Sequence, residues 1–185
     1  MGGAYAYFTA TATQKQATAT TGIIRVKFGE NDPKIVVSGS SVVNNAMIVP
    51  GSTVNYSGTV INDGTVGMWA VLECSVYVDD MTTPVQTEFY QVNGSGSTGA
   101  TKVIYDSTAT DELQRFKTSA TLVAYQGSQA FTITFQFATT YNNDYLKKSA
   151  KIVVIAHAIQ ENHVEGVQAT NLLLQGKQPV LPSST

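Results

Sequence analysis

The sequence has little charge, and this shortage excludes several classes of protein. Its 185 residues carry 11 Lys and Arg against 13 Asp and Glu, a formal net charge of −2. Without a basic excess, no part of the chain attracts nucleic-acid phosphates by bulk charge, so no nucleic-acid partner is expected. No apolar run reaches the roughly 18 to 20 residues that cross a bilayer as a helix, so no membrane span is expected in the mature chain.

Cysteine is almost absent as well. The single cysteine, Cys74, excludes an intramolecular disulfide. It shares one face of an alternating segment with five apolar residues, which are Met68, Ala70, Leu72, Val76 and Val78. No histidine or helix N-terminus stands near it in sequence to activate the thiol, so we expect a small buried hydrophobe rather than a nucleophile.

Thr and Val, by contrast, supply about a quarter of the residues, and both suit pleated, half-buried surfaces. Alternating segments predict about nine to eleven strands at spacings of roughly 8 to 15 residues. The main ones are 22–28, 34–37, 41–49, 53–61, 67–78, 85–92, 118–125, 130–138 and 150–159. A short helix is expected within 107–116, while 162–174 fits either a helical turn or a last strand. This pattern predicts an all-β sandwich, jelly roll or Greek-key barrel.

The N-terminus has the cleanest alternation in the chain. Small or aromatic apolar residues occupy one face (Ala4, Ala6, Phe8, Ala10 and Ala12), while Tyr5 and Tyr7 begin the other. No charge precedes Lys15, and an uncharged strand of this kind is an aggregation hazard when it is left loose. We therefore expect it to pair with a sheet, either its own or a neighbour's. Ala4-Tyr5-Ala6 also fits the small-x-small pattern of a signal cleavage site.

The expected organisation is a single domain with extended ends. An N-terminal strand covers 1–14, a polar linker 15–21, the β-sandwich 22–174 and a polar C-terminal tail 175–185.

The residues that could carry chemistry are sparse. His157 and His163 are the only histidines, and they lack the i, i+4 spacing of a zinc-binding helix. On one strand they would lie about 20 Å apart, so a metal site with Glu161 or Glu165 requires a chain reversal. No Gly-x-Ser-x-Gly elbow or phosphate loop is present, and we predict no catalytic residues, no cofactor and no enzyme.

Two triplets match glycosylation acceptors, at Asn55 and Asn93. Such triplets arise often by chance. Asn93 lies in the Gly- and Ser-rich segment 93–99, which has no apolar residue to anchor it and is expected to be a surface loop.

Three ordered segments resemble the TasA/camelysin family of secreted biofilm-matrix fibre subunits, which includes the related archaeal bundling pili. They are 2–9 with 17–26, then 49–65 with its Pro-Gly turn and Asn-Asp-Gly turn, and 151–160, which ends Ala-His-Ala-Ile-Gln. The resemblance implies a jelly-roll-like β-sandwich with an extended N-terminal strand, secreted to the cell surface. It also implies a homopolymer of identical subunits, with lateral bundling of the fibres as a further contact.

Three hypotheses follow from the residues and the resemblance. The first is a structural filament or pilus subunit polymerising head-to-tail by donor-strand complementation, with residues 1–14 as the donor and Ala4, Tyr5, Ala6, Tyr7, Phe8, Ala10 and Ala12 at the contact. The second is a camelysin-type secreted metalloprotease that uses His157 and His163. The third is a monomeric cell-surface binding module whose N-terminal strand folds back into its own sheet.

Overall fold

The structure is a computed structural model of the 185-residue chain. It describes residues 7–11, 17–18, 25–29, 34–38, 51, 53–78, 81–92, 99–137, 150–161 and 164–181. The predicted strand 41–49 lies outside these residues. None of the helices in the described ranges has the length and apolar character needed to cross a membrane.

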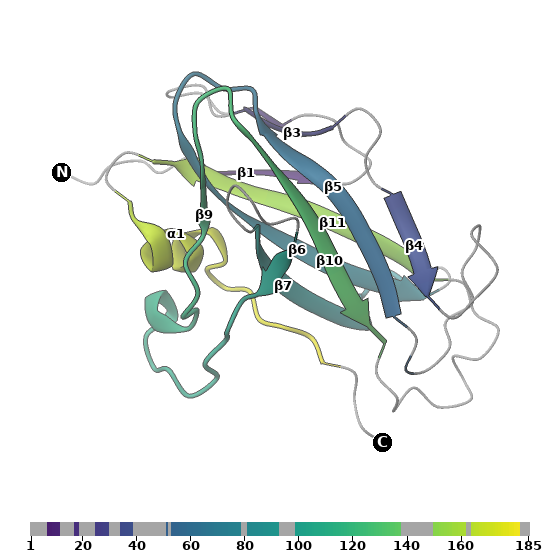
Figure 1. The fold of residues 1–185 in the computed structure, drawn as a ribbon. Helices are drawn as coiled ribbons and strands as arrows, with labels where there is room; N and C mark the ends of the chain where they lie inside the picture. The colour runs from purple at the N-terminus through teal and green to yellow at the C-terminus, as the bar shows by residue number, and fades with distance from the viewer. Residues whose placement is uncertain are drawn as a thin grey trace.

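Two antiparallel sheets face each other and confirm the all-β prediction (Figure 1). Sheet A has the order β1 (Tyr7–Thr11), β11 (Ala150–Gln160), β6 (Met68–Val78), β7 (Gln86–Val92), β8 (Ala100–Lys102), with β9 (Thr121–Val123) also paired to β6. Sheet B has the order β10 (Ser128–Gln136), β5 (Thr53–Asn62), β3 (Arg25–Phe28), β2 (Ala17–Thr18), with β4 (Lys34–Ser38) also paired to β5.

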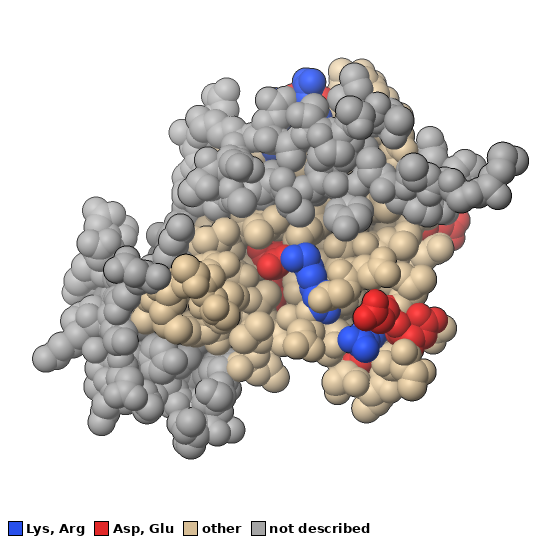
Figure 2. Space-filling view, turned by 180° about the vertical axis from the view of Figure 1, so that it is seen from behind, with Lys and Arg blue, Asp and Glu red and all other residues tan. Residues whose placement is uncertain are grey.

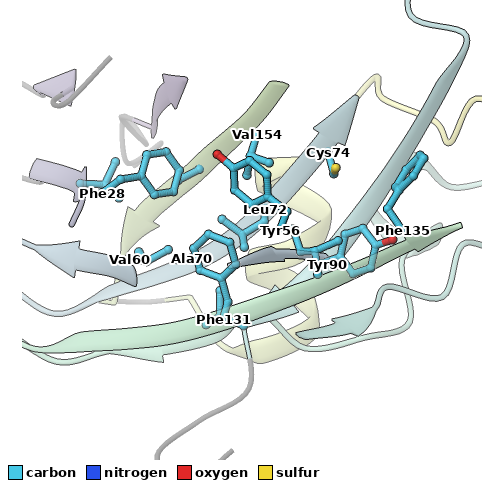
Figure 3. Close-up of a cluster of buried hydrophobic side chains, with 14 of the residues drawn as sticks. Phe28, Tyr56, Val60, Ala70, Leu72, Cys74, Tyr90, Phe131, Phe135 and Val154 are labelled. Atoms are coloured by element: carbon cyan, nitrogen blue, oxygen red, sulfur yellow. The ribbon is translucent and has the colours of Figure 1, made fainter. Parts of the chain in front are cut away.

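The main core lies between the sheets and combines small residues on one side with large rings on the other. Sheet A contributes the fully buried Ala70 and its register partner Ala158. Sheet B contributes Tyr56 and Phe131, whose rings stack with centroids 6.1 Å apart, and Phe28, whose ring meets Phe131 edge-on (Figure 3). Large side chains opposite small ones let the two faces interdigitate without voids.

Cys74 takes part in this core, as predicted, and is fully buried on the inner face of β6 (Figure 3).

At one end of the sandwich, the Asn62 side chain hydrogen-bonds the end of β5 to neighbouring turns. Its side-chain amide donates to the carbonyls of Val66 (2.8 Å), Val123 (3.1 Å) and Ala124 (3.1 Å), while its Oδ1 accepts from the Gly64 N–H at 3.0 Å. A buried amide with this many partners fixes the relative position of three chain segments.

The outer face of sheet A is also covered, which makes it the middle of three layers. Helix α1 (Gly166–Leu173) and the chain from 103 to 120 pack on that face around a second apolar cluster. Its buried members are Val71, Phe89, Val103, Phe116, Ala120, Ile159, Val164, Ala169, Leu173 and Leu174. The segment 162–174 was expected to form either a helical turn or a last strand, and the structure shows a helix there. It starts at Gly166 (φ 35°), where a Cβ would meet Ser119 Oγ at 2.9 Å.

The helix predicted within 107–116 is wrong except for one 3₁₀ turn, η1 (Glu112–Gln114). Asp111 caps this turn by accepting a hydrogen bond from the Leu113 N–H at 2.9 Å. Just beyond it, the Phe116 backbone is tied to α1, because its N–H donates to Asn171 Oδ1 and its carbonyl accepts from Asn171 Nδ2, both at 2.8 Å. These two bonds replace the ones that a continuing helix would need.

The chain ends also join the sheets. β1 pairs antiparallel with β11 of its own chain, so the strand that we expected to find in its own or a neighbour's sheet lies in its own (Figure 1). β2 falls within the predicted linker 15–21 and pairs with β3. Within the predicted C-terminal tail, Val180 exchanges two backbone hydrogen bonds with Thr87 of β7, at 2.9 and 3.0 Å.

Candidate subunit-contact site

The site that bears on the predicted assembly is the rim of sheet A, where β1 meets β11. β11 has 11 residues, and β1 pairs with five of them, from Thr11 opposite Ile155 to Tyr7 opposite Ile159. β1 ends the strand order of sheet A, so in the described part of the chain it bonds to one neighbour only. A terminal strand attached along one edge is separable from its sheet without breaking any other strand pair.

The predicted contact residues of the N-terminal strand fall partly in this region. Phe8 and Ala10 occupy register positions opposite Ala158 and Ala156, two alanines that are buried in the main core. Tyr7 stands opposite Ile159. The remaining predicted residues (Ala4, Tyr5, Ala6 and Ala12) lie outside the described residues.

The outer face of β11 carries a buried polar cluster, in which a carboxylate has two nitrogen partners. Glu73 Oε2 lies 2.7 Å from His157 Nε2 and 2.9 Å from Lys177 Nζ. The His157 side chain is only 1% exposed, that of Glu73 is 13% exposed, and Lys177 reaches in from the segment that follows α1. Glu73 thus joins β6, β11 and the chain after the helix.

Electrostatics favour the charged form of Glu73. Burial raises the pKa of its carboxyl, but the hydrogen bonds and charges of His157 and Lys177 outweigh burial and bring the pKa below the ordinary value of 4.5. The other ring nitrogen of His157, Nδ1, is buried and has no hydrogen-bond partner among the described residues. Seen from behind, most of the described surface is uncharged, and its charged side chains gather in a few places (Figure 2).

The predicted alternative metal site is not assembled by the residues that the structure describes. His157 bonds to Glu73, whereas Glu161 and Glu165 are both exposed, with Glu165 at the N-cap of α1. His163 lies outside the described residues. Among the described residues, no three His, Cys, Asp or Glu side chains gather closely enough to hold a metal ion.

Sequence reasoning missed the pairing of Glu73 with His157. A signal was present, since Glu73 is the only acidic residue among the mostly apolar and small side chains of β6, and His157 stands in an apolar run of β11, whose one charged residue, Lys151, is near its start. Two such residues on neighbouring buried strands are expected to satisfy each other, because an unpaired buried polar group is costly. Lys177 had no comparable signal.

A second buried carboxylate, Glu88, lies on the inner face of β7. It accepts hydrogen bonds from the Tyr90 hydroxyl and from Lys102 Nζ, the latter at 2.6 Å. Burial, followed by the nearby Glu88 charge, raises the pKa of the Tyr90 hydroxyl and likewise that of the Cys74 thiol. A thiol with a raised pKa is a poor nucleophile, so the environment of Cys74 suits packing rather than catalysis.

Of the two asparagines in predicted glycosylation triplets, the structure describes one. Asn55 lies on β5, and its Oδ1 accepts a hydrogen bond from Thr134 Oγ1 at 3.0 Å at an exposed position of sheet B. Asn93 lies outside the described residues. Whether either carries a glycan stays a prediction.

No protein-family model, curated protein or solved structure matches this chain. The resemblance to the TasA/camelysin proteins therefore stays a prediction drawn from the three ordered sequence segments.

Proposed function

We propose that this protein is a structural subunit of an extracellular filament. Its fold would be a jelly-roll-like sandwich, and its N-terminal strand would serve as the element that one subunit lends to the next. The proposal rests on the uncharged, alternating N-terminus, on the family resemblance and on one structural observation, the position of β1.

The position of β1 supports the proposal because β1 lies at the edge of sheet A and pairs in register with β11. Its five residues pair only with β11 in the described part of the chain, at the rim of sheet A. The opposing Ala156 and Ala158 are small, and their strand continues for five residues beyond the paired region, from Ala150 to Val154. A strand from another subunit would meet the same backbone groups and the same small side chains.

Strand exchange would keep the same backbone hydrogen bonds to β11, but a neighbouring chain would supply the strand. A neighbour's residues 7–11 would take the register now held by β1, with Phe8 opposite Ala158. Donor and acceptor surfaces differ on each subunit, so the contact is head-to-tail and does not close on itself. Repetition of such a contact produces a fibre.

A second function, a monomeric cell-surface binding module, is favoured by the cis pairing. β1 lies on its own sheet in a single chain, as that hypothesis requires. The two functions differ in whether β1 leaves β11 when many chains are present. Filament formation therefore depends on exchange of the strand and not on the closed fold alone.

The first experiment is removal of the donor. Deleting residues 1–14 should leave folded protein that does not polymerise, and Phe8→Asp should have a similar but milder effect. Electron microscopy checks for fibres, and circular dichroism checks the fold. Fibres of unchanged morphology from the truncated chain would refute the proposal.

The second experiment detects exchange in the intact chain. In a Thr11→Cys/Ile155→Cys variant, the two new thiols are register partners, and Cys74 does not compete because it is fully buried. Oxidised fibres should give a ladder of covalent oligomers on a denaturing gel, whereas cis pairing gives only an internally linked monomer. Thr11→Cys alone is the matched control. A monomer band alone, at every protein concentration, would establish the monomeric module instead.

A further inference from the structure

We propose that the open edge of β10 is a second contact surface, which pairs antiparallel with β10 of another copy of this chain. β10 is one end of the strand order of sheet B, and its nine residues pair with β5 alone in the part of the chain that the structure describes. This surface is separate from the β1–β11 rim and does not depend on strand exchange.

The hydrogen-bond pattern identifies which backbone groups face outward. The Asn62 N–H donates to the Gly127 carbonyl at 2.9 Å, so this pair is hydrogen-bonded, and bonding to β5 recurs at every second residue of β10. Ala130, Thr132 and Thr134 are the alternate residues. Their N–H and carbonyl groups therefore point away from β5, and the Ala130 and Thr134 side chains are exposed.

The composition of β10 leaves this edge without the usual protection against pairing. The segment Ser-Gln-Ala-Phe-Thr-Ile-Thr-Phe-Gln contains no charge, proline or glycine, which are the usual devices that keep exposed edges from pairing. The β8 edge of sheet A, by contrast, has features that hinder pairing with another strand. β8 is three residues long and includes Lys102, and Pro179 precedes the bridge at Val180.

A second β10 fits this edge because the strand is self-complementary about its centre. Antiparallel pairing centred on Thr132 places Thr132 opposite its own copy, Ala130 opposite Thr134, and Ser128 opposite Gln136. Every one of these cross-strand pairs is uncharged, and Thr–Thr pairs are favourable in antiparallel sheets. The inward side chains of Phe131 and Ile133 are already buried in their own core and keep their places, while the outward Gln136 carbonyl would exchange its hydrogen bond from Gln86 Nε2 (3.2 Å) for one from the second copy's Ser128 N–H. The resulting dimer is closed and two-fold symmetric, unlike the head-to-tail contact.

Cysteine cross-linking tests both the partner and the register. Thr132→Cys should form a disulfide-linked dimer, and a mixture of Ala130→Cys chains with Thr134→Cys chains should form the mixed dimer in preference to either self-linked species. Equal cross-linking at all positions, or none at high protein concentration, would overturn the proposal. A link between Ala130→Cys and Thr11→Cys chains would show that a neighbour's N-terminal strand is the occupant, and would also overturn it.

A proline variant tests the role of the backbone. Ala130→Pro removes an N–H that points away from β5, so the ladder within the subunit is kept while two bonds of the symmetric dimer are lost. The yield of Thr132→Cys dimer should fall about tenfold in this background, and Ala130→Val, which retains the N–H, should leave it unchanged. An unchanged yield in folded Ala130→Pro would contradict the proposal.

A charge exchange provides a readout that does not depend on proline. Thr132→Lys alone should be monomeric by analytical ultracentrifugation, because two lysines would face each other across the two-fold axis. Mixing it with Thr132→Glu should restore the dimer. A mixture that stays monomeric would count against the pairing. None of these variants touches β1 or β11, so fibre formation and edge pairing are scored separately.

Discussion

Replacing Glu73 by alanine tests whether the buried cluster on the outer face of sheet A fastens the third layer to the sheet. The carboxylate joins His157 of β11 at 2.7 Å and Lys177, beyond α1, at 2.9 Å. Its removal breaks both contacts at once. It also leaves His157, whose Nδ1 has no partner in the described residues, without a hydrogen bond at Nε2.

The size of the effect follows from the burial of the two partners. His157 is 1% exposed, and a buried polar atom left unsatisfied costs about 1–3 kcal/mol. Lys177 is 38% exposed, so its ion pair contributes no more than about 1 kcal/mol. Glu73→Ala should therefore lower the free energy of unfolding by about 1–4 kcal/mol, and Lys177→Met by less than about 1 kcal/mol.

Urea unfolding followed by tryptophan fluorescence provides the measurement, because the indole N–H of Trp69 donates to the Val164 carbonyl at 2.7 Å beside the helix. The matched control is Glu73→Met/His157→Leu, which removes both polar partners and should recover most of the loss. If Glu73→Ala were as stable as the parent, or if the double variant were less stable than Glu73→Ala, the reasoning would be refuted.

Three further outcomes are expected. Because the folded pKa of Glu73 lies below 4.5, its carboxylate stabilises the fold at and above that pH, and this contribution is lost as the pH falls through the folded value. The parent should therefore lose stability in acid relative to Glu73→Met/His157→Leu, which lacks the carboxylate, and a parent that gained stability relative to this variant as the pH fell would contradict the assignment. Asn62→Ala should lower the free energy of unfolding by about 2–3 kcal/mol in urea titrations, since it leaves three carbonyls without their donor, and a loss below 0.5 kcal/mol (roughly one weak bond) would show that water replaces them. Cys74 should resist thiol reagents in native buffer and react as urea unfolds the chain, because burial raises its pKa, and rapid labelling of native protein would contradict the buried position.

Strand alternation was the most informative part of the sequence. The predicted segments 53–61, 67–78, 85–92 and 150–159 correspond to β5, β6, β7 and β11 within a residue or two at each end. These strands have regular patterns because one or both of their faces meet an apolar layer. Local signals failed where tertiary contacts decided the structure: Asn171 holds the Phe116 backbone and prevents a longer helix at η1.

The candidate site was predictable only in part. The N-terminal alternation indicated a strand that would pair with a sheet, and in the structure Tyr7–Thr11 pairs with β11 of sheet A. The choice of β11 as the partner depends on contacts between residues about 150 positions apart, and alternation contains no information about such pairing. The Glu73–His157–Lys177 cluster likewise requires three elements to meet, which a pattern within one element does not report.

The location of β1 on its own subunit has a kinetic consequence for any assembly that uses it. A segment of the same chain competes with incoming segments for its docking edge at an effective concentration of roughly the millimolar range. Free subunits at micromolar concentration would therefore remain closed, and growth would be limited by release of the tethered segment rather than by collision. If the proposed filament forms, its free subunits would be held in an inert form, and elongation would start where chains are crowded or where a filament end already has an unpaired strand edge.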